Sequence, residues 1–142
     1  MTDGGPPAEV GEWEPVEHRF HHLPVHTALL HTGKVLAFGG SGNDETSLDD
    51  PHPAELFDPD AGTVEVLDGE LAGDVFCAGH AFLPDGRLLV AGGTAGYDGP
   101  VSLPGLPKLP PFRGLEQSYV FDPDSEGWTR VDDMAAGRWY PT

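Results

Sequence analysis

The sequence of 142 residues has little cysteine, few basic residues and no long apolar run, and each shortage excludes a class of protein. One cysteine cannot form an internal disulfide. Seven Lys and Arg against 24 Asp and Glu give a net charge of -17, which repels phosphate backbones and anionic lipid. No stretch approaches the roughly 20 apolar residues of a membrane helix. We therefore expect no nucleic-acid partner and no membrane partner.

The amino-terminal residues have no targeting pattern. Residues 1–9 contain neither a basic region nor an apolar core, so they do not predict a secretion signal. The default expectation is a cytoplasmic protein, with secretion as the alternative if a signal has been removed.

Stretches free of glycine and proline are also short. The chain has 20 Gly and 15 Pro, and the longest segment without either is nine residues, 128–136. Helices of ten or more residues are nearly excluded, whereas strands of four to six residues fit between the turn formers. The sequence therefore predicts an all-β protein.

The chain contains an internal repeat. Residues 26–40 and 80–93 share an apolar run, a turn glycine and a Gly-Gly pair, and each copy is followed by a Phe-Asp-Pro-Asp segment that begins at Phe57 or Phe121. The copies differ in length because a proline-rich insertion at 96–113 lies in the second, where we expect a long surface loop.

Each copy predicts four strands. In the first copy they lie near 26–30, near 34–38, up to residue 57 and at 63–66. In the second copy they lie near 78–83, near 87–91, up to residue 121 and at 128–131.

A four-stranded unit of about 50 residues with a Gly-Gly pair is typical of a kelch-type propeller blade. The predicted architecture is a partial kelch-type β-propeller of about two blades plus the start of a third. The expected divisions are a polar lead at 1–17, blade 1 at 18–74, blade 2 at 75–136 including the insertion, and a truncated first strand of blade 3 at 137–142. Propellers close with about four to eight blades. We therefore expect the chain to be the amino-terminal part of a longer propeller.

Cys77 and Tyr140 occupy related places in this arrangement. Cys77 follows Asp-Val-Phe and is expected to open the first strand of blade 2, and Tyr140, in Arg-Trp-Tyr-Pro-Thr, is expected to open that of blade 3. First strands of neighbouring blades line the central channel, so the two side chains can meet at one mouth of it. When each residue is considered alone, the simpler interpretation of Cys77 is a small buried apolar residue, and that of Tyr140 is an aromatic strand residue.

The segments around Cys77 and Tyr140 together resemble those of the galactose oxidase and glyoxal oxidase family of copper-radical oxidases. The resemblance covers about residues 20–142. It implies a thioether bond between the Cys77 sulfur and the Tyr140 ring as a redox cofactor, with Tyr140 also a copper ligand. It further implies oxidation of a primary alcohol or aldehyde by O₂, with H₂O₂ as the second product. Arg138, two residues before Tyr140, could contact the substrate, although a salt bridge at the rim is the simpler interpretation.

The sequence departs from the family in its copper ligands. The family uses a second tyrosine and two histidines from later blades, and none of those segments is present. We expect the isolated chain to be inactive and to need the remaining blades, in cis or in trans.

Other interpretations remain open. The chain could belong to a non-catalytic kelch propeller that binds a protein or a glycan, or its two blades could act alone as a small interaction module. The histidine cluster at residues 18, 21, 22 and 26 could bind a metal. His26 and His80 occupy equivalent repeat positions, which favours a structural role between blades.

Overall fold

The computed structural model describes residues 6, 11, 15, 17, 19–42, 44–48, 52–67, 71–97 and 112–141. Its regular elements are strands, apart from one short 3-10 helix, η1 (Glu45–Ser47). In the described part of the chain no helix has the length and apolar character needed to cross a membrane. The predicted all-β class is confirmed.

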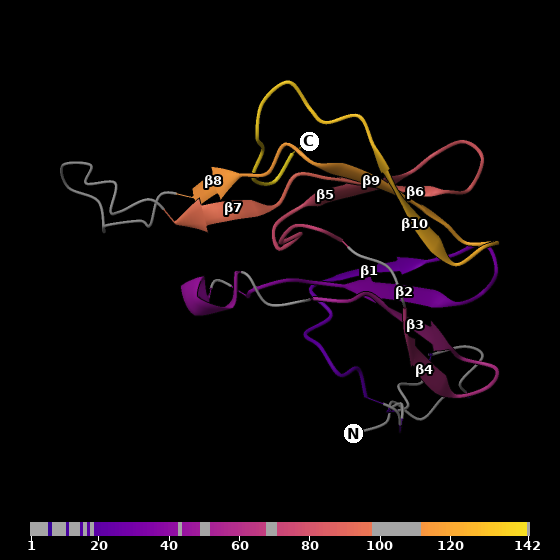
Figure 1. Ribbon diagram of the computed structural model, residues 1–142. Coiled ribbons are helices and arrows are strands. Elements are labelled where there is room, and N and C mark those ends of the chain that lie inside the picture. The colour runs from indigo at the N-terminus through magenta and orange to yellow at the C-terminus, as the bar shows by residue number, and fades with distance from the viewer. Residues whose placement is uncertain are drawn as a thin grey trace.

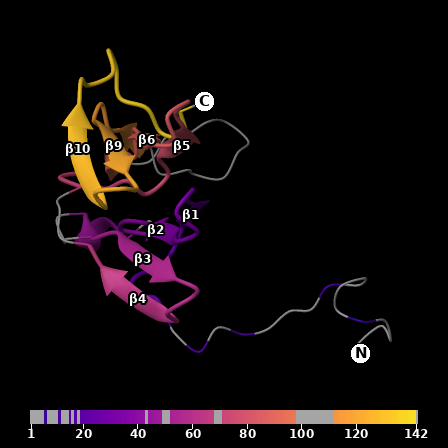
Figure 2. The ribbon, with the colours of Figure 1, turned by 90° about the vertical axis from the view of Figure 1, so that its right-hand side faces the viewer.

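Eight of the strands form two antiparallel sheets that lie one above the other (Figures 1 and 2). The first sheet has the order β1-β2-β3-β4 and the second the order β10-β9-β6-β5. The strands of the first sheet are β1 (His26–Leu29), β2 (Val35–Phe38), β3 (Glu55–Asp58) and β4 (Thr63–Val66). Those of the second sheet are β5 (Gly79–Phe82), β6 (Leu88–Ala91), β9 (Ser118–Asp122) and β10 (Gly127–Val131). This pair of sheets is compatible with two neighbouring propeller blades.

The repeated residues build the same hairpin in both sheets. Gly33 N donates to the Leu30 carbonyl at 3.0 Å, and Gly86 N donates to the Leu83 carbonyl at 2.9 Å. The two glycines have φ of 86° and 89°, a region that residues with a Cβ rarely adopt. The turn glycine therefore recurs because the β1–β2 and β5–β6 turns both need a left-handed residue.

The proline-rich insertion is flanked by a hairpin that the sequence analysis missed. Strands β7 (Thr94–Tyr97) and β8 (Phe112–Gly114) pair in a separate two-stranded sheet, which projects from the second sheet (Figure 1). The predicted loop at 96–113 is therefore wrong at both ends, because the flanking residues pair across the insertion. Residues 98–111 of the insertion lie outside the described residues, as do most of 1–17.

The core lies between the two sheets. Leu36, Phe38 and Leu56 from the first sheet are at most 2% exposed, and so are Leu88 and Phe121 from the second. Burying side chains of this size contributes about 1.5–3 kcal/mol each. The sheets are thus held face to face mainly by apolar burial.

Ring contacts extend this core to the edge formed by β1 and β5. The His26 and His80 rings lie 5.4 Å apart, and Phe38 contacts both. The equivalent repeat positions therefore meet across the two sheets, in agreement with the structural role expected for them.

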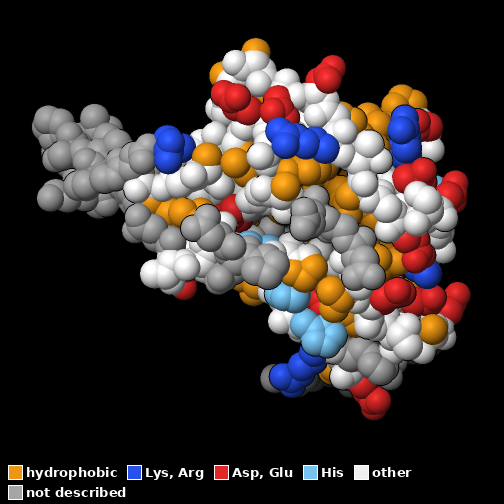
Figure 3. Space-filling view, viewed as in Figure 1, with side chains coloured by type: hydrophobic (Ala, Val, Ile, Leu, Met, Phe, Trp, Pro, Cys, Tyr) orange, Lys and Arg blue, Asp and Glu red, His pale blue; other side chains and the backbone are white. Residues whose placement is uncertain are grey.

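Charged contacts at the surface are few. Lys34 Nζ lies 2.7 Å from Glu126 Oε1 and so joins a β1–β2 hairpin residue to the β9–β10 turn. Acidic side chains are spread over several parts of the face seen in Figure 3, whereas basic side chains are isolated.

A buried carboxylate fixes the segment that precedes β1. Glu55, 2% exposed, accepts hydrogen bonds from the backbone N–H groups of His21 and His22 at 2.9 and 3.0 Å, and its Oε1 lies 2.7 Å from His21 Nδ1. Burial raises the pKa of Glu55, but these hydrogen bonds outweigh it and leave the pKa below its ordinary value of 4.5.

The depressed pKa predicts acid sensitivity that depends on Glu55. The carboxylate stabilises the fold fully above pH 4.5, where it is ionised in both states, and this contribution is lost as the pH falls through the lower folded pKa. In urea unfolding, Glu55→Gln should lower the free energy of unfolding by about 1–3 kcal/mol at neutral pH. The difference from the native chain should shrink in acid. Glu65→Gln, an exposed change on the adjacent strand, serves as the control, and a loss at Glu55 that is independent of pH would contradict the prediction.

Candidate functional site

Cys77 lies in a loop shaped by Asp74. Asp74, 4% exposed, accepts hydrogen bonds at Oδ1 from Ser41 N and Phe76 N, both at 3.0 Å. Ser41 follows the Gly-Gly pair after β2, so one carboxylate oxygen joins the first sheet to the loop before β5. A Cβ at Gly40 would overlap the same oxygen. The Gly-Gly pair therefore makes room for Asp74.

Two further hydrogen bonds attach this loop to β7. Thr94 N donates to the Asp74 carbonyl at 2.8 Å, and Thr94 Oγ1 donates to the Phe76 carbonyl at 2.9 Å. Cys77 itself is 1% exposed. Hydrogen bonds to Ser41 and to Thr94 thus hold the loop of Cys77 independently of any contact with Tyr140.

The structure brings Tyr140 to Cys77. Tyr140 N donates to the Cys77 carbonyl at 2.8 Å. The neighbouring Cys77 side chain raises the pKa of the Tyr140 phenol above its ordinary value of 10.0, first through hydrogen bonding and then through charge. The Tyr140 ring is 58% exposed and lies against the Trp139 ring, with centroids 4.7 Å apart. Tyr140 is therefore bound to a buried cysteine through its backbone, while more than half of its side chain remains open to solvent.

Neither residue opens a strand, which corrects the expected placement. Strand β5 begins at Gly79, two residues after Cys77, and Tyr140 lies in a bend. Both backbones are left-handed, with φ of 64° at Cys77 and 52° at Tyr140. Residues in this conformation form turns, so neither residue pairs as part of a strand.

This left-handed conformation costs about 1–2 kcal/mol for each residue that has a Cβ. Among the described residues only one other non-glycine residue, Glu126 in the β9–β10 turn, has a positive φ of this kind. Backbone strain of this type clusters at functional sites, where the surroundings impose it. The strain at Cys77 and Tyr140 marks the same pair of residues that the sequence analysis selected.

Arg138 lies near the pair but is attached through its backbone. Arg138 N donates to the Leu115 carbonyl at 2.9 Å, and Gly93 N donates to the Arg138 carbonyl at 3.1 Å. The Arg138 side chain is exposed and forms no ion pair with any described residue. The rim salt bridge considered for it is therefore not seen in the described part of the chain.

The described residues do not complete a copper site. They contain no group of three His, Cys, Asp or Glu side chains placed to hold a metal. His18 lies outside the described residues, while His21 and His22 bind Glu55. Tyr140 and Cys77 offer one phenol and one sulfur, so a copper ion would need ligands from elsewhere.

Tyr97 is a neighbour that the sequence analysis did not single out. Its hydroxyl lies 3.2 Å from Ser41 Oγ. Burial raises the pKa of Tyr97, and the charges of Asp74 and Cys77 add to this effect. The Asp-x-Phe spacing before Cys77 could have revealed Asp74, because Asp side chains often accept the backbone N–H two residues later. No comparable signal existed for Tyr97, which depends on the unpredicted β7–β8 hairpin.

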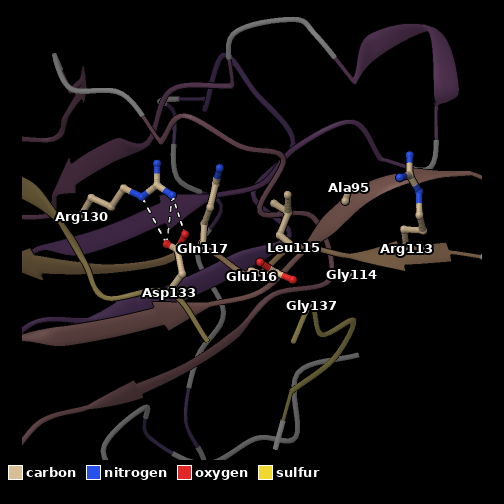
Figure 4. A pocket seen from close by; sticks show the side chains of 9 residues that line it. All are labelled: Ala95, Arg113, Gly114, Leu115, Glu116, Gln117, Arg130, Asp133 and Gly137. Carbon is tan, nitrogen blue, oxygen red and sulfur yellow. Dashed lines mark hydrogen bonds and ion pairs between the residues drawn. The ribbon is translucent and has the colours of Figure 1, made fainter. Parts of the chain in front are cut away.

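A surface hollow of about 520 Å³ lies on another side of the carboxy-terminal segment (Figure 4). Arg113 of β8 lies at one end and Arg130 at the other, where Arg130 Nη2 binds the Asp133 carboxylate at 2.8 and 3.0 Å. Neither Cys77 nor Tyr140 lines the hollow. The hollow nevertheless reaches Gly114 and Gly137, and Gly137 is next to Arg138 in the sequence.

Comparison with known proteins gives a likeness of fold. No protein-family model matches the chain, and no curated protein matches it. A solved structure of a novel fungal alcohol oxidase of the AA5 family, in complex with copper, matches with a TM-score of 0.64 and 22% sequence identity. The match covers 91% of this chain and 24% of the oxidase chain. At this identity the likeness shows that the chain has the fold of one part of that oxidase.

The loop contacts predict that Asp74 controls both stability and the burial of Cys77. Asp74→Ala should lower the free energy of unfolding by about 1–3 kcal/mol, because two backbone N–H groups lose their acceptor. Buried Oδ2 has no hydrogen-bond partner among the described atoms, which limits the loss. The Cys77 thiol should also react faster with a small thiol reagent.

Asp122→Ala provides the comparison for Asp74→Ala. Asp122 accepts a backbone N–H from Asp124 at 2.9 Å in an exposed turn far from Cys77 in the sequence. Its removal should leave the thiol reaction rate unchanged. Equal thiol rates in the two variants would show that Asp74 does not hold the Cys77 loop.

Proposed function

We propose that this chain supplies the Cys–Tyr part of the active site of a copper-radical oxidase of the galactose oxidase type. In this proposal its two sheets are two blades of a kelch-type propeller, and the remaining blades join in cis or in trans. The observation that carries the proposal is the hydrogen bond from Tyr140 N to the Cys77 carbonyl, which joins two residues that both have a left-handed backbone. The likeness to the fungal alcohol oxidase supports it at the level of fold.

The pair would mature by forming a thioether. The Cys77 thiol and the Tyr140 ring carbon next to the hydroxyl each lose one hydrogen as the carbon–sulfur bond forms. Dioxygen accepts the two protons and two electrons and leaves as H₂O₂. Sulfur attached at this position donates electron density, so the phenol ring loses an electron more easily than that of an unmodified tyrosine.

The overall reaction of the complete enzyme would convert a primary alcohol and O₂ to an aldehyde and H₂O₂, or oxidise an aldehyde in the same way. Tyr140 would be the one copper ligand from this chain, because the described residues offer no further ligand set. Arg138, exposed and two residues from Tyr140, would contact the substrate. The isolated chain should therefore produce no H₂O₂ from primary alcohols.

Thioether formation can be measured directly by intact mass, on this chain joined to the remaining blades that would complete the copper site. After exposure to copper(II) and air, the intact mass of the native chain should fall by two hydrogen atoms. Peptide mapping should then recover residues 77 and 140 in one linked fragment. The reaction should proceed because the backbone hydrogen bond from Tyr140 N to the Cys77 carbonyl already holds the two residues together. Oxidation to sulfenic acid or methionine sulfoxide would instead add oxygen to the mass.

Two variants serve as controls for the mass experiment. Cys77→Ala removes the sulfur and Tyr140→Phe removes the hydroxyl, so neither should lose the two hydrogens. If the native chain keeps its full mass and a free thiol even when it is joined to blades that bind copper, the oxidase proposal fails. A non-catalytic kelch propeller would then be the better description.

A further inference from the structure

The segment that carries Tyr140 is held by its backbone, while its side chains remain exposed. Arg138 is exposed, and Trp139 and Tyr140 are 37% and 58% exposed. Three backbone hydrogen bonds attach the segment: Arg138 N to the Leu115 carbonyl, Gly93 N to the Arg138 carbonyl, and Tyr140 N to the Cys77 carbonyl. Backbone hydrogen bonds to three separate parts of the chain therefore fix the position of Tyr140.

Two glycines beneath this segment allow the close approach. A Cβ at Gly79 would come within 3.0 Å of the Pro141 carbonyl, and a Cβ at Gly114 would come within 3.0 Å of the Arg138 backbone. Real Cβ atoms essentially never show contacts this short. Gly79 begins β5 and Gly114 ends β8, and both ribbon views show the carboxy-terminal segment beside β5 (Figures 1 and 2).

The two contacts lie on either side of Tyr140 in the sequence. The nearest atoms to a Cβ at Gly79 all belong to Pro141, and those to a Cβ at Gly114 all belong to Arg138. Neither glycine has a positive φ. An alanine at either position would therefore leave its own strand unstrained and would displace only the segment that lies on it.

We propose that Gly79 and Gly114 are positioning residues for the Cys–Tyr pair. By lacking a side chain, they let residues 138–141 settle on β5 and β8, which brings the Tyr140 phenol to the Cys77 sulfur and covers that sulfur. The catalytic meaning of this placement rests on the proposed function, whereas the placement itself can be tested without copper.

The first test measures the reaction of Cys77 with a small aromatic disulfide reagent in the copper-free chain. Gly79→Ala and Gly114→Ala should each raise the reaction rate roughly ten- to a hundred-fold. The added methyl group overpacks the contact and shifts residues 138–141 away from β5 and β8. Gly127→Ala is the matched control, since a Cβ there meets nothing closer than 3.5 Å and its φ is ordinary. Its rate should equal that of the native chain.

Urea unfolding separates positioning from general damage. The midpoints of the two alanine variants should stay close to that of Gly127→Ala, because the segment makes few side-chain contacts. Unchanged thiol rates in both variants would overturn the inference. A raised rate that only accompanies global unfolding would overturn it as well, and using two separate positions guards against one variant that fails to fold.

The second test follows thioether formation in copper(II) and air. Both alanine variants should form the linkage more slowly than the native chain, by about the factor seen for exposure of the thiol. If the native chain forms no linkage while the thiol rates change as expected, the proposed function fails and the positioning role of the glycines stands. If the linkage forms equally fast in all chains, the glycines do not position the pair.

Discussion

The buried carboxylate of Asp74 is the interaction on which the rest of the candidate site depends. It accepts backbone N–H groups from Ser41, which follows β2 of the first sheet, and from Phe76, inside the loop that precedes the second sheet. Amide groups buried at such a junction cost free energy unless they find an acceptor. One side chain therefore joins the two sheets and shapes the loop that carries Cys77.

The Gly-Gly pairs explain how the same arrangement occurs twice. A Cβ at Gly40 would overlap Asp74, and a Cβ at Gly92 would lie too close to the Arg138 carbonyl. In each copy the pair thus lies against a segment from further along the chain. The loop that leads to Cys77 lies against the first pair, and the segment of Tyr140 lies against the second.

The Cys77–Tyr140 pair combines a strained backbone with one buried and one exposed side chain. Both backbones are left-handed, so the free energy that holds Cys77 against Tyr140 comes from the surrounding hydrogen bonds and overcomes a local penalty. The sulfur is buried, whereas the phenol is more than half exposed. Such a pair is protected on the sulfur side and accessible on the phenol side, as a radical centre that meets a substrate would need to be.

Much of the fold could be predicted from the sequence, because glycine, proline and Asp-Pro-Asp restrict the chain locally. The turn glycines at 33 and 86 fix the hairpins, and Asp58 Oδ1 accepts the N–H of Asp60 at 2.9 Å as its turn requires. The β7–β8 hairpin was missed because its strands pair across the proline-rich insertion and have no alternating pattern of their own. Loop closure over such a distance is decided by the pairing partners and leaves no local signal.

The sequence by itself determined the all-β class, the internal repeat and the choice of Cys77 and Tyr140 as a pair, since these depend on residue type and spacing. The tertiary structure decided that the two residues lie in left-handed turns outside the strands and that Asp74 binds the loop of Cys77. It also decided that Gly79 and Gly114 lie close beneath the segment of Tyr140 and that Tyr97 lies nearby. These features arise from buried hydrogen bonds and close backbone approaches between distant segments. Such contacts form only when the two sheets have packed together, so no local pattern of residues could specify them.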